Sequence, residues 1–174
     1  MTQVTVSKII IDTLCNIWTK ELMMDYKSGF VYDLASLKTT LYYHIRNHLG
    51  DIFLKQHNLV IYIDFKLASN QYFDLAIVQT HQTETQELLV AMKLKWIRHK
   101  DDKITLSDIH MLPLFLELEQ YKNVQFVTAL VKEPSMISDD AISLLPQTMK
   151  QKYSNFSELI AYHKNNLMKW EVKK

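Results

Sequence analysis

Two apolar segments carry charged side chains at a spacing that suits phosphate chemistry. Asp74 lies early in QYFDLAIVQ, and Lys93 and Lys95 lie in ELLVAMKLKW. If the two segments form a regular hairpin whose loop is centred near residue 83, Asp74 faces residue 93. Because side chains alternate along a strand, Lys93 and Lys95 share one face. The sequence therefore predicts an Asp-Lys-Lys cluster on one side of a hairpin.

A basic patch continues from the same segment into the loop that follows it. Its residues accompany Trp96, and they are Lys93, Lys95, Arg98, His99, Lys100 and Lys103. Lysine and arginine contact phosphates, and an indole ring stacks on a base, so the patch predicts nucleic-acid binding. The alternative interpretation is a charged rim and a solvated loop. The net charge is only +1, so we expect any such binding to come from this local patch.

Other residue types that carry chemistry lack the partners that they need. His44 and His48 are spaced i, i+4 on a predicted helix, as in many zinc sites, but no Glu follows His44 as in HExxH. We interpret His44 as a partly buried structural histidine. Cys15 is the single cysteine, and no serine has a G-x-S-x-G context. The sequence therefore predicts neither a zinc enzyme nor a nucleophilic hydrolase.

The composition is that of one soluble globular domain. The chain has 174 residues, of which 48% are hydrophobic and 22% charged, so it can bury a core of its own. It has only 2 glycines, so no Gly-rich loop can cradle a phosphate. No apolar stretch reaches the roughly 20 residues that cross a bilayer, and the N-terminus does not resemble a secretion signal. We expect no membrane contact and a cytoplasmic location.

Hydrophobic periodicity divides the chain into helices and strands. Helical spacing predicts an N-terminal helix over 4–24, a second over 33–54 with Asp33 placed to cap it, a third over 107–121, and a C-terminal helical region over 137–168 with short helices at 139–153 and 156–166. Strand patterns cover 58–67, 71–79, 87–96 and 123–133. We expect the tail beyond Trp170 to fray. This order predicts a single α/β domain with a mixed central sheet of about four strands flanked by helices.

These elements and charged residues resemble the PD-(D/E)XK nuclease superfamily, which has the restriction-endonuclease-like fold. In that family an acid on a helix precedes a strand Asp, and a Glu-x-Lys follows on the next strand. The resemblance covers residues 33–133, with Asp33 as the helix acid, Asp74 of FDLAIV as the strand Asp, and Lys95 of VAMKLKW as the lysine. Lys93 stands where the family has its Glu. The chain thus resembles a degenerate member.

The resemblance implies a metal-dependent site in which one acidic position is substituted. Asp33, Asp74 and Lys95 would be the catalytic positions, with Asp74 a ligand of Mg²⁺ or Mn²⁺ and the lysine orienting the attacking water. Lys93 brings a positive charge to the place of the metal, and we expect it to form a salt bridge with Asp74 instead. A carboxylate on a neighbouring element could replace the missing one, and the candidates are Asp64, Glu117 and Glu119.

Three functional hypotheses follow from these residues. The first is a nuclease-like domain with a degenerate metal site, which acts by binding nucleic acid or a protein partner. The second is an active Mg²⁺- or Mn²⁺-dependent nuclease with a relocated carboxylate. The third is a protein-interaction module, such as a mobile-element-encoded inhibitor or accessory subunit, and a homodimer fits it too. The simplest alternative to all three is that Asp74, Lys93 and Lys95 form the solvated face of an ordinary hairpin.

Overall fold

The computed structural model describes residues 3–67, 72–81, 85–98, 121–133 and 154–173. Three helices come first, namely α1 (Gln3–Thr19), α2 (Glu21–Lys27) and α3 (Leu34–Gln56). Six strands follow, namely β1 (Leu59–Lys66), β2 (Tyr72–Thr80), β3 (Gln86–Ile97), β4 (Gln125–Lys132), β5 (Phe156–Lys164) and β6 (Leu167–Lys173). None of the described helices is both long and apolar enough to cross a membrane.

The strands form one mixed sheet in the order of the sequence, from β1 to β6. The first three are an antiparallel meander, β4 lies parallel to β3 and to β5, and β6 returns antiparallel to β5. The predicted α/β class with a mixed sheet is confirmed, although the sheet has six strands where we expected about four. Parallel neighbours require a crossover connection. The helix predicted there, over 107–121, lies outside the described residues except for Tyr121.

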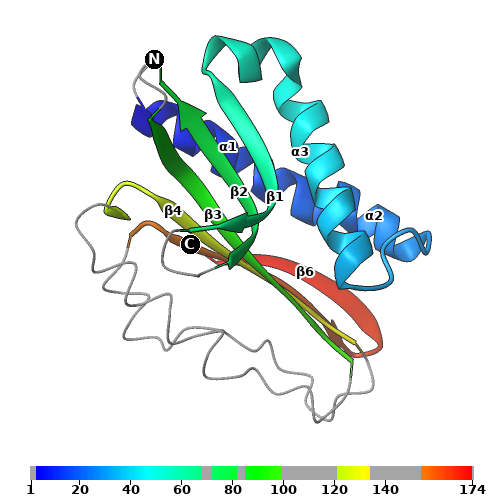
Figure 1. The fold of residues 1–174 in the computed structure, drawn as a ribbon. Helices are drawn as coiled ribbons and strands as arrows, with labels where there is room; N and C mark the ends of the chain where they lie inside the picture. Colours follow the sequence, from blue (N-terminus) through cyan, green and yellow to red (C-terminus); the bar gives the residue numbers. More distant parts are fainter. Residues whose placement is uncertain (1–2, 68–71, 82–84, 99–120, 134–153, 174) are drawn as a thin grey trace.

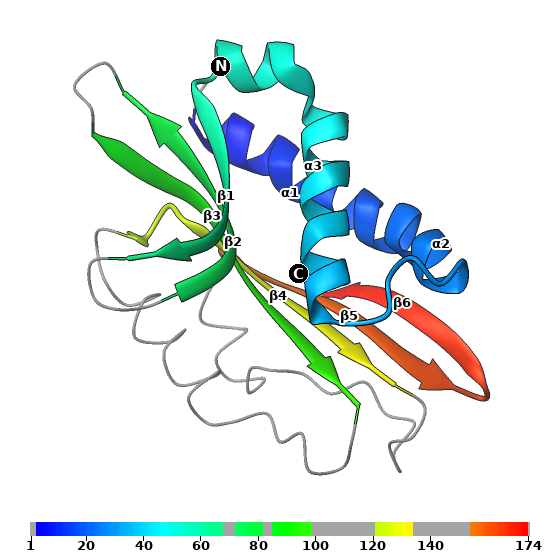
Figure 2. The ribbon, with the colours of Figure 1, turned by 45° about the vertical axis from the view of Figure 1, so that its right-hand side comes forward.

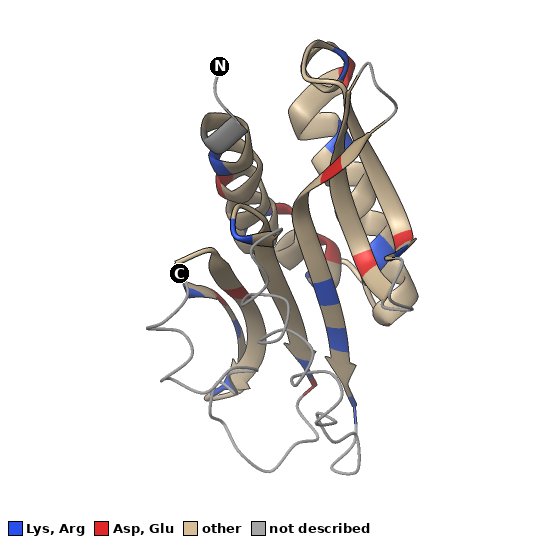
Figure 3. Cartoon of the chain, turned by 60° about the vertical axis from the view of Figure 1, so that its left-hand side comes forward, with Lys and Arg blue, Asp and Glu red and all other residues tan. Residues whose placement is uncertain are grey.

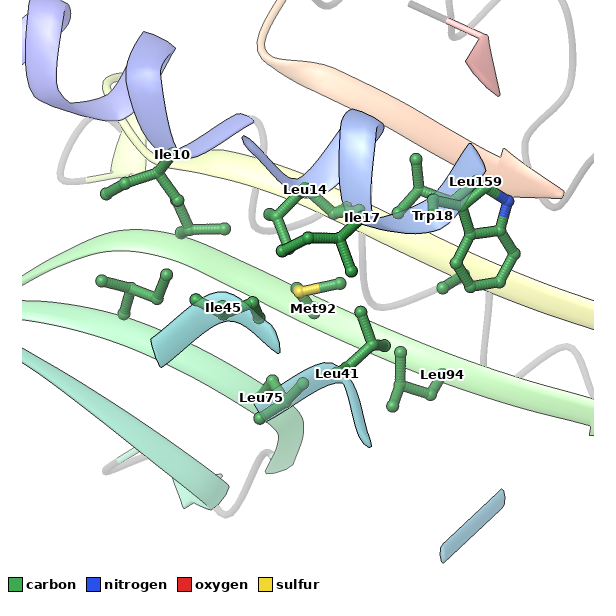
Figure 4. Close-up of a cluster of buried hydrophobic side chains, with 14 of the residues drawn as sticks. Ile10, Leu14, Ile17, Trp18, Leu41, Ile45, Leu75, Met92, Leu94 and Leu159 are labelled. Carbon is green, nitrogen blue, oxygen red and sulfur yellow. The ribbon is translucent and has the colours of Figure 1, made fainter. Parts of the chain in front are cut away.

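All three helices lie on one face of the sheet (Figures 1 and 2). Their apolar stripes follow helical spacing and meet side chains of the sheet in the main core (Figure 4). Residues at the centre of this core are Ile10, Leu14 and Ile17 of α1, Leu41 and Ile45 of α3, and Leu75, Met92 and Leu159 of the sheet. Each such side chain contributes about 1.5–3 kcal/mol when fully buried. This packing fixes the start of α3 over β2 and β3, where the charged residues lie.

The opposite face of the sheet carries a second, smaller core. Its buried members are Phe73, Ala91, Val124, Phe126 and Phe156. Strands β3 to β5 therefore bury side chains on both faces, which is typical of strands with parallel neighbours.

The C-terminal region differs from the prediction. We expected helices over 137–168, but Phe156–Lys164 and Leu167–Lys173 are strands, and the segment 137–153 lies outside the described residues. The end of the chain is also paired and not frayed, since Trp170 lies opposite Ala161 in the hairpin.

A tight turn explains how these two strands form a hairpin. Asn165 and Asn166 have φ values of 52° and 61°, in the left-handed region that asparagine tolerates. Two successive residues with positive φ are what a type I′ hairpin turn needs. The Trp170 ring packs on Trp18 of α1, with ring centroids 4.8 Å apart, so this contact joins the hairpin to α1 and stabilises both.

Candidate functional site

Strand β2 separates from β3 at Asp74. Backbone pairing between them ends at Leu75 and Met92, although β3 continues beside β4 as far as Ile97. The start of β2 stays paired with β1 instead. Figures 1 and 2 show this end of the β1–β2 hairpin curling away from β3. The sheet therefore opens between residues 72–74 of β2 and residues 93–97 of β3. We call this opening the fork, and Asp74 lies at its base.

The carboxylate of Asp74 takes the place of the missing strand neighbour. Its Oδ2 accepts a hydrogen bond of 2.9 Å from the backbone N–H of Leu94, on the side of β3 that faces β2. Leu94 is buried, and a buried N–H without an acceptor is costly. Asp74 thus satisfies the backbone of β3 where the strand pairing stops.

Lys38 of α3 places its ammonium group between two carboxylates at this fork. Its Nζ lies 2.5 Å from Oδ1 of Asp64 and 3.3 Å from Oδ1 of Asp74. Asp64 has a φ of 54°, so β1 is irregular where its carboxylate turns to Lys38. Burial lowers the pKa of Lys38, but the hydrogen bonds and charges of Asp64 and Asp74 outweigh it and raise that pKa above its ordinary value. Lys38 is therefore a cation at neutral pH.

Lys93 does not occupy the position that we predicted for its side chain. The pairing of β2 with β3 ends at Leu75 and Met92, one residue short of the predicted pair of residues 74 and 93. Among the described residues, no ion pair joins Asp74 to Lys93. The Lys93 Nζ lies 6.0 Å from the centre of the Phe73 ring, which belongs to the smaller core on the face opposite to α1, α2 and α3. The structure thus pairs Asp74 with Lys38 and directs Lys93 away from both.

Asp33 caps helix α3, as its position in the sequence predicted. Its Oδ1 accepts a hydrogen bond of 2.7 Å from the backbone N–H of Ser36, and the Ser36 Oγ accepts one of 2.9 Å from the backbone N–H of Asp33. This is a reciprocal capping box. The hydrogen bonds from the backbone and side chain of Ser36 hold the pKa of Asp33 below its ordinary value. A catalytic function for Asp33 stays a prediction.

The capping function leads to a prediction about stability. We expect Asp33→Ala to lower the melting temperature at pH 7. Asp33→Asn should lower it much less, because asparagine caps helices well. Since folding lowers the pKa of Asp33, its contribution is present above the ordinary value of 3.8 and is lost as the pH falls below it. The difference between wild type and Asp33→Ala should therefore shrink in acid. Equal melting temperatures at pH 7 would rule out the capping function.

A pocket of about 430 Å³ joins the start of α3 to the end of β3. Its lining residues are Asp33, Leu34, Ala35, Lys38, Trp96 and Arg98. Trp96 and Arg98 belong to the predicted nucleic-acid patch, and Lys38 connects the pocket to Asp74. The fold thus brings Asp33, Asp74, Trp96 and Arg98 to one end of the sheet, whereas Lys95, the lysine of the resemblance, lies on the face of β3 opposite to Leu94 and Trp96.

Arg98 connects three elements at the rim of this pocket. It donates a hydrogen bond of 2.6 Å to the carbonyl of Tyr32, its Nε lies 3.5 Å from Oε1 of Glu133, and its guanidinium lies 5.9 Å from the Trp96 ring centre. The Trp96 indole N–H also donates to Glu133, at 2.6 Å. Because 45% of the Arg98 side chain stays exposed, it can still reach an anion.

The other predicted site residues divide between described and undescribed segments. Lys95 shares a face of β3 with Lys93 and is partly buried. Lys100 and Lys103 of the patch, and the candidate carboxylates Glu117 and Glu119, lie outside the described residues. Within the part of the chain that the structure describes, no group of three or more His, Cys, Asp or Glu side chains could hold a metal ion.

The buried carboxylate of Glu158 was not among the predicted site residues, because it lies in β5, which we predicted to be helical. Glu158 is 1% exposed, and the strand register places it beside Thr128, which in turn lies beside Lys93. Asp74 lies on β2, which is the next strand beyond β3, so three strand spacings separate it from Glu158. With neighbouring strands about 4.8 Å apart, Asp74 and Glu158 are roughly 14 Å apart at their backbones, too far to share one metal ion. Glu158 therefore does not replace the missing carboxylate.

The two spaced histidines connect α3 to α2. His44 Nε2 lies 2.6 Å from Oδ2 of Asp25, and His48 Nε2 lies 3.0 Å from Oε1 of Glu21. The His44 side chain is 16% exposed, in agreement with a partly buried structural residue.

Comparison with known proteins identifies no relative of this chain. No protein-family model matches it, and no curated protein or solved structure matches it significantly.

Proposed function

We propose that this chain is a nuclease-like domain with a degenerate metal site, and that it binds the phosphates of a nucleic acid at the pocket between α3 and β3. The observation that carries the proposal is the lining of that pocket, where Lys38, Arg98 and the first turn of α3 meet the Trp96 ring. Ammonium and guanidinium groups bind phosphate oxygens.

The order of the elements supports the nuclease-like part of the proposal. Helix α3, the antiparallel meander β1 to β3 and the parallel strand β4 follow one another as the PD-(D/E)XK resemblance requires. Asp33 begins the helix, Asp74 lies on β2, and Lys95 lies on β3. Membership of that superfamily and a restriction-endonuclease-like fold are part of this proposal.

The charges at the fork support a site that does not cleave. The ammonium of Lys38 already contacts both Asp64 and Asp74, so a divalent cation would have to displace it. Lys93 stands where the family has a third carboxylate. An active nuclease could draw on Asp64 as the relocated carboxylate, but that carboxylate is bound to Lys38. We therefore place this alternative second.

Exposed apolar side chains favour a protein partner as another candidate. Tyr43 and Ile52 of α3 are 60% and 75% exposed. Large apolar side chains on a surface are common in protein interfaces, including those of homodimers. Charge does not decide between the two kinds of partner, because Figure 3 shows basic and acidic residues interspersed over the described elements. The salt dependence of binding separates them, since only phosphate contacts weaken steeply with salt.

Binding of labelled DNA and RNA, measured by fluorescence anisotropy at several salt concentrations, tests the proposal. We expect Arg98→Ala to weaken binding about tenfold, as the loss of one charge-assisted hydrogen bond predicts. Arg46→Ala is the matched control, because Arg46 is an exposed arginine of α3 that pairs with Asp51 and does not line the pocket. We expect no cleavage with Mg²⁺ or Mn²⁺. Equal losses in the two variants, or no binding at low salt, would reject the pocket as the binding site.

A further inference from the structure

Two aromatic rings lie exposed in the segment that leads into α3. Phe30 and Tyr32 are 68% and 63% exposed, whereas Val31 between them is 1% exposed. The burial of Val31 anchors this segment to the main core and leaves its neighbours on both sides directed outward. Exposed rings of this size are what binding surfaces recruit, since they offer a large apolar face at low cost in conformational entropy.

The backbone that carries these rings is fixed by hydrogen bonds. The carbonyl of Tyr32 accepts from Arg98, and the N–H of Tyr32 donates to the Ser36 Oγ at 2.9 Å. The N–H groups of Phe30 and Val31 point to the carbonyl of Asp25, at 2.9 and 3.3 Å. A platform that is already ordered loses little conformational entropy when a ligand covers it.

Tyr32 adjoins the groups that we propose to bind phosphate, and Phe30 lies two residues before it in the same ordered segment. Tyr32 directly precedes Asp33, which lines the pocket, and Arg98 contacts Tyr32 and the Trp96 ring. A nucleic acid whose phosphates lie in the pocket therefore has its bases close to the rim. In a duplex each base is covered by its neighbours, so an exposed ring can stack only on unpaired bases.

We infer, on the basis of the proposed function, that the ligand is a single-stranded nucleic acid whose phosphates contact Arg98 and Lys38 and whose bases stack on Tyr32 and Phe30. Each ring contributes about tenfold to affinity, in the lower part of the range for base stacking. Stacking accepts any base, so the domain binds with little sequence preference.

The test measures three ligands of equal length: a single strand, its duplex, and an abasic strand that keeps the phosphates without the bases. We expect wild type to prefer the single strand. Phe30→Ala and Tyr32→Ala should each weaken its binding about tenfold and leave the abasic strand unaffected. Arg98→Ala should weaken both. Tyr43→Ala is the control, because Tyr43 is a similarly exposed tyrosine that lies about 14 Å along α3 from the helix start at Leu34.

The outcomes separate this inference from the proposed function. If Arg98→Ala weakens binding but Phe30→Ala and Tyr32→Ala do not, the phosphate pocket stands and the stacking inference is overturned. A preference of wild type for the duplex overturns it too. If wild type binds none of the three ligands at low salt, both proposals fail. DNA and RNA strands of the same sequence are compared, and stacking on either one supports the inference.

Discussion

Asp74→Ala is expected to lower the free energy of unfolding by about 2–3 kcal/mol, the largest effect of a single substitution at this site. The variant leaves the buried N–H of Leu94 without its acceptor and removes one of the two carboxylates of Lys38. An unsatisfied buried donor alone costs about 1–3 kcal/mol. Urea denaturation measures the change as a shift in midpoint at constant slope.

Two further variants separate the backbone contact from the charge. Asp64→Ala also removes a carboxylate from Lys38, but the Asp64 side chain is 68% exposed, so we expect a loss of about 0–1 kcal/mol. Asp74→Asn keeps an oxygen that can accept a hydrogen bond from the N–H of Leu94. Its loss in free energy of unfolding should therefore lie between the losses of the two alanine variants. If Asp74→Ala and Asp64→Ala cost the same, the contact with Leu94 does not stabilise the fork.

The first four strands were predictable because each is a short run rich in β-branched and aromatic residues, bounded by polar residues. Each lies within two residues of its expected limits; β2, for example, was expected over 71–79 and spans Tyr72–Thr80. The predicted register of the β2–β3 hairpin agrees with the pairing from Leu75–Met92 to Ile77–Val90, whereas a bulge between Ile77 and Val78 shifts the pairing by one residue nearer the turn. Local patterns determine these features.

Strand β5 was missed because its burial erases the pattern that identifies strands. Leu159 and Ala161 face the helices, and Ile160 and Tyr162, which alternate with them, are also buried. A strand buried on both faces loses its period-two alternation, and its short apolar run then resembles part of a helix. The turn at Asn165 and Asn166 was the signal that could have corrected the interpretation.

The partner of Asp74 was missed for a different reason. Periodicity assigns side chains to faces, but it does not reveal where one strand leaves its neighbour. Asp74 turns into the fork because β2 stops pairing there, and Lys38 reaches it because core packing lays α3 over the fork. Both the end of the strand pairing and the position of α3 depend on the tertiary structure. The sequence therefore indicated Asp33, Asp74 and Arg98 as candidate residues, but the predicted partner of Asp74 was Lys93 and its partner in the structure is Lys38.

Lys38→Met tests whether the ammonium group stands in for a metal ion. Methionine keeps an apolar stem of similar size but leaves Asp64 and Asp74 without their cation. We expect a loss of about 1–3 kcal/mol at pH 7, because a partly buried charge pair is broken from one side. Folding raises the pKa of Lys38, so its contribution is complete below the ordinary value of 10.5 and is lost as the pH rises through the raised pKa. The two proteins should therefore converge only in strong alkali.

The same variant should acquire an affinity for Mn²⁺ that wild type lacks. Without Lys38, the two carboxylates attract a divalent cation, and binding to the folded state raises the melting temperature. Lys55→Met is the control, since Lys55 is an exposed lysine in the last turn of α3. Millimolar Mn²⁺ should stabilise Lys38→Met and leave wild type and Lys55→Met unchanged. If Mn²⁺ stabilises wild type as much, Lys38 does not exclude the metal, and the active-nuclease alternative becomes the better explanation of Asp64 and Asp74.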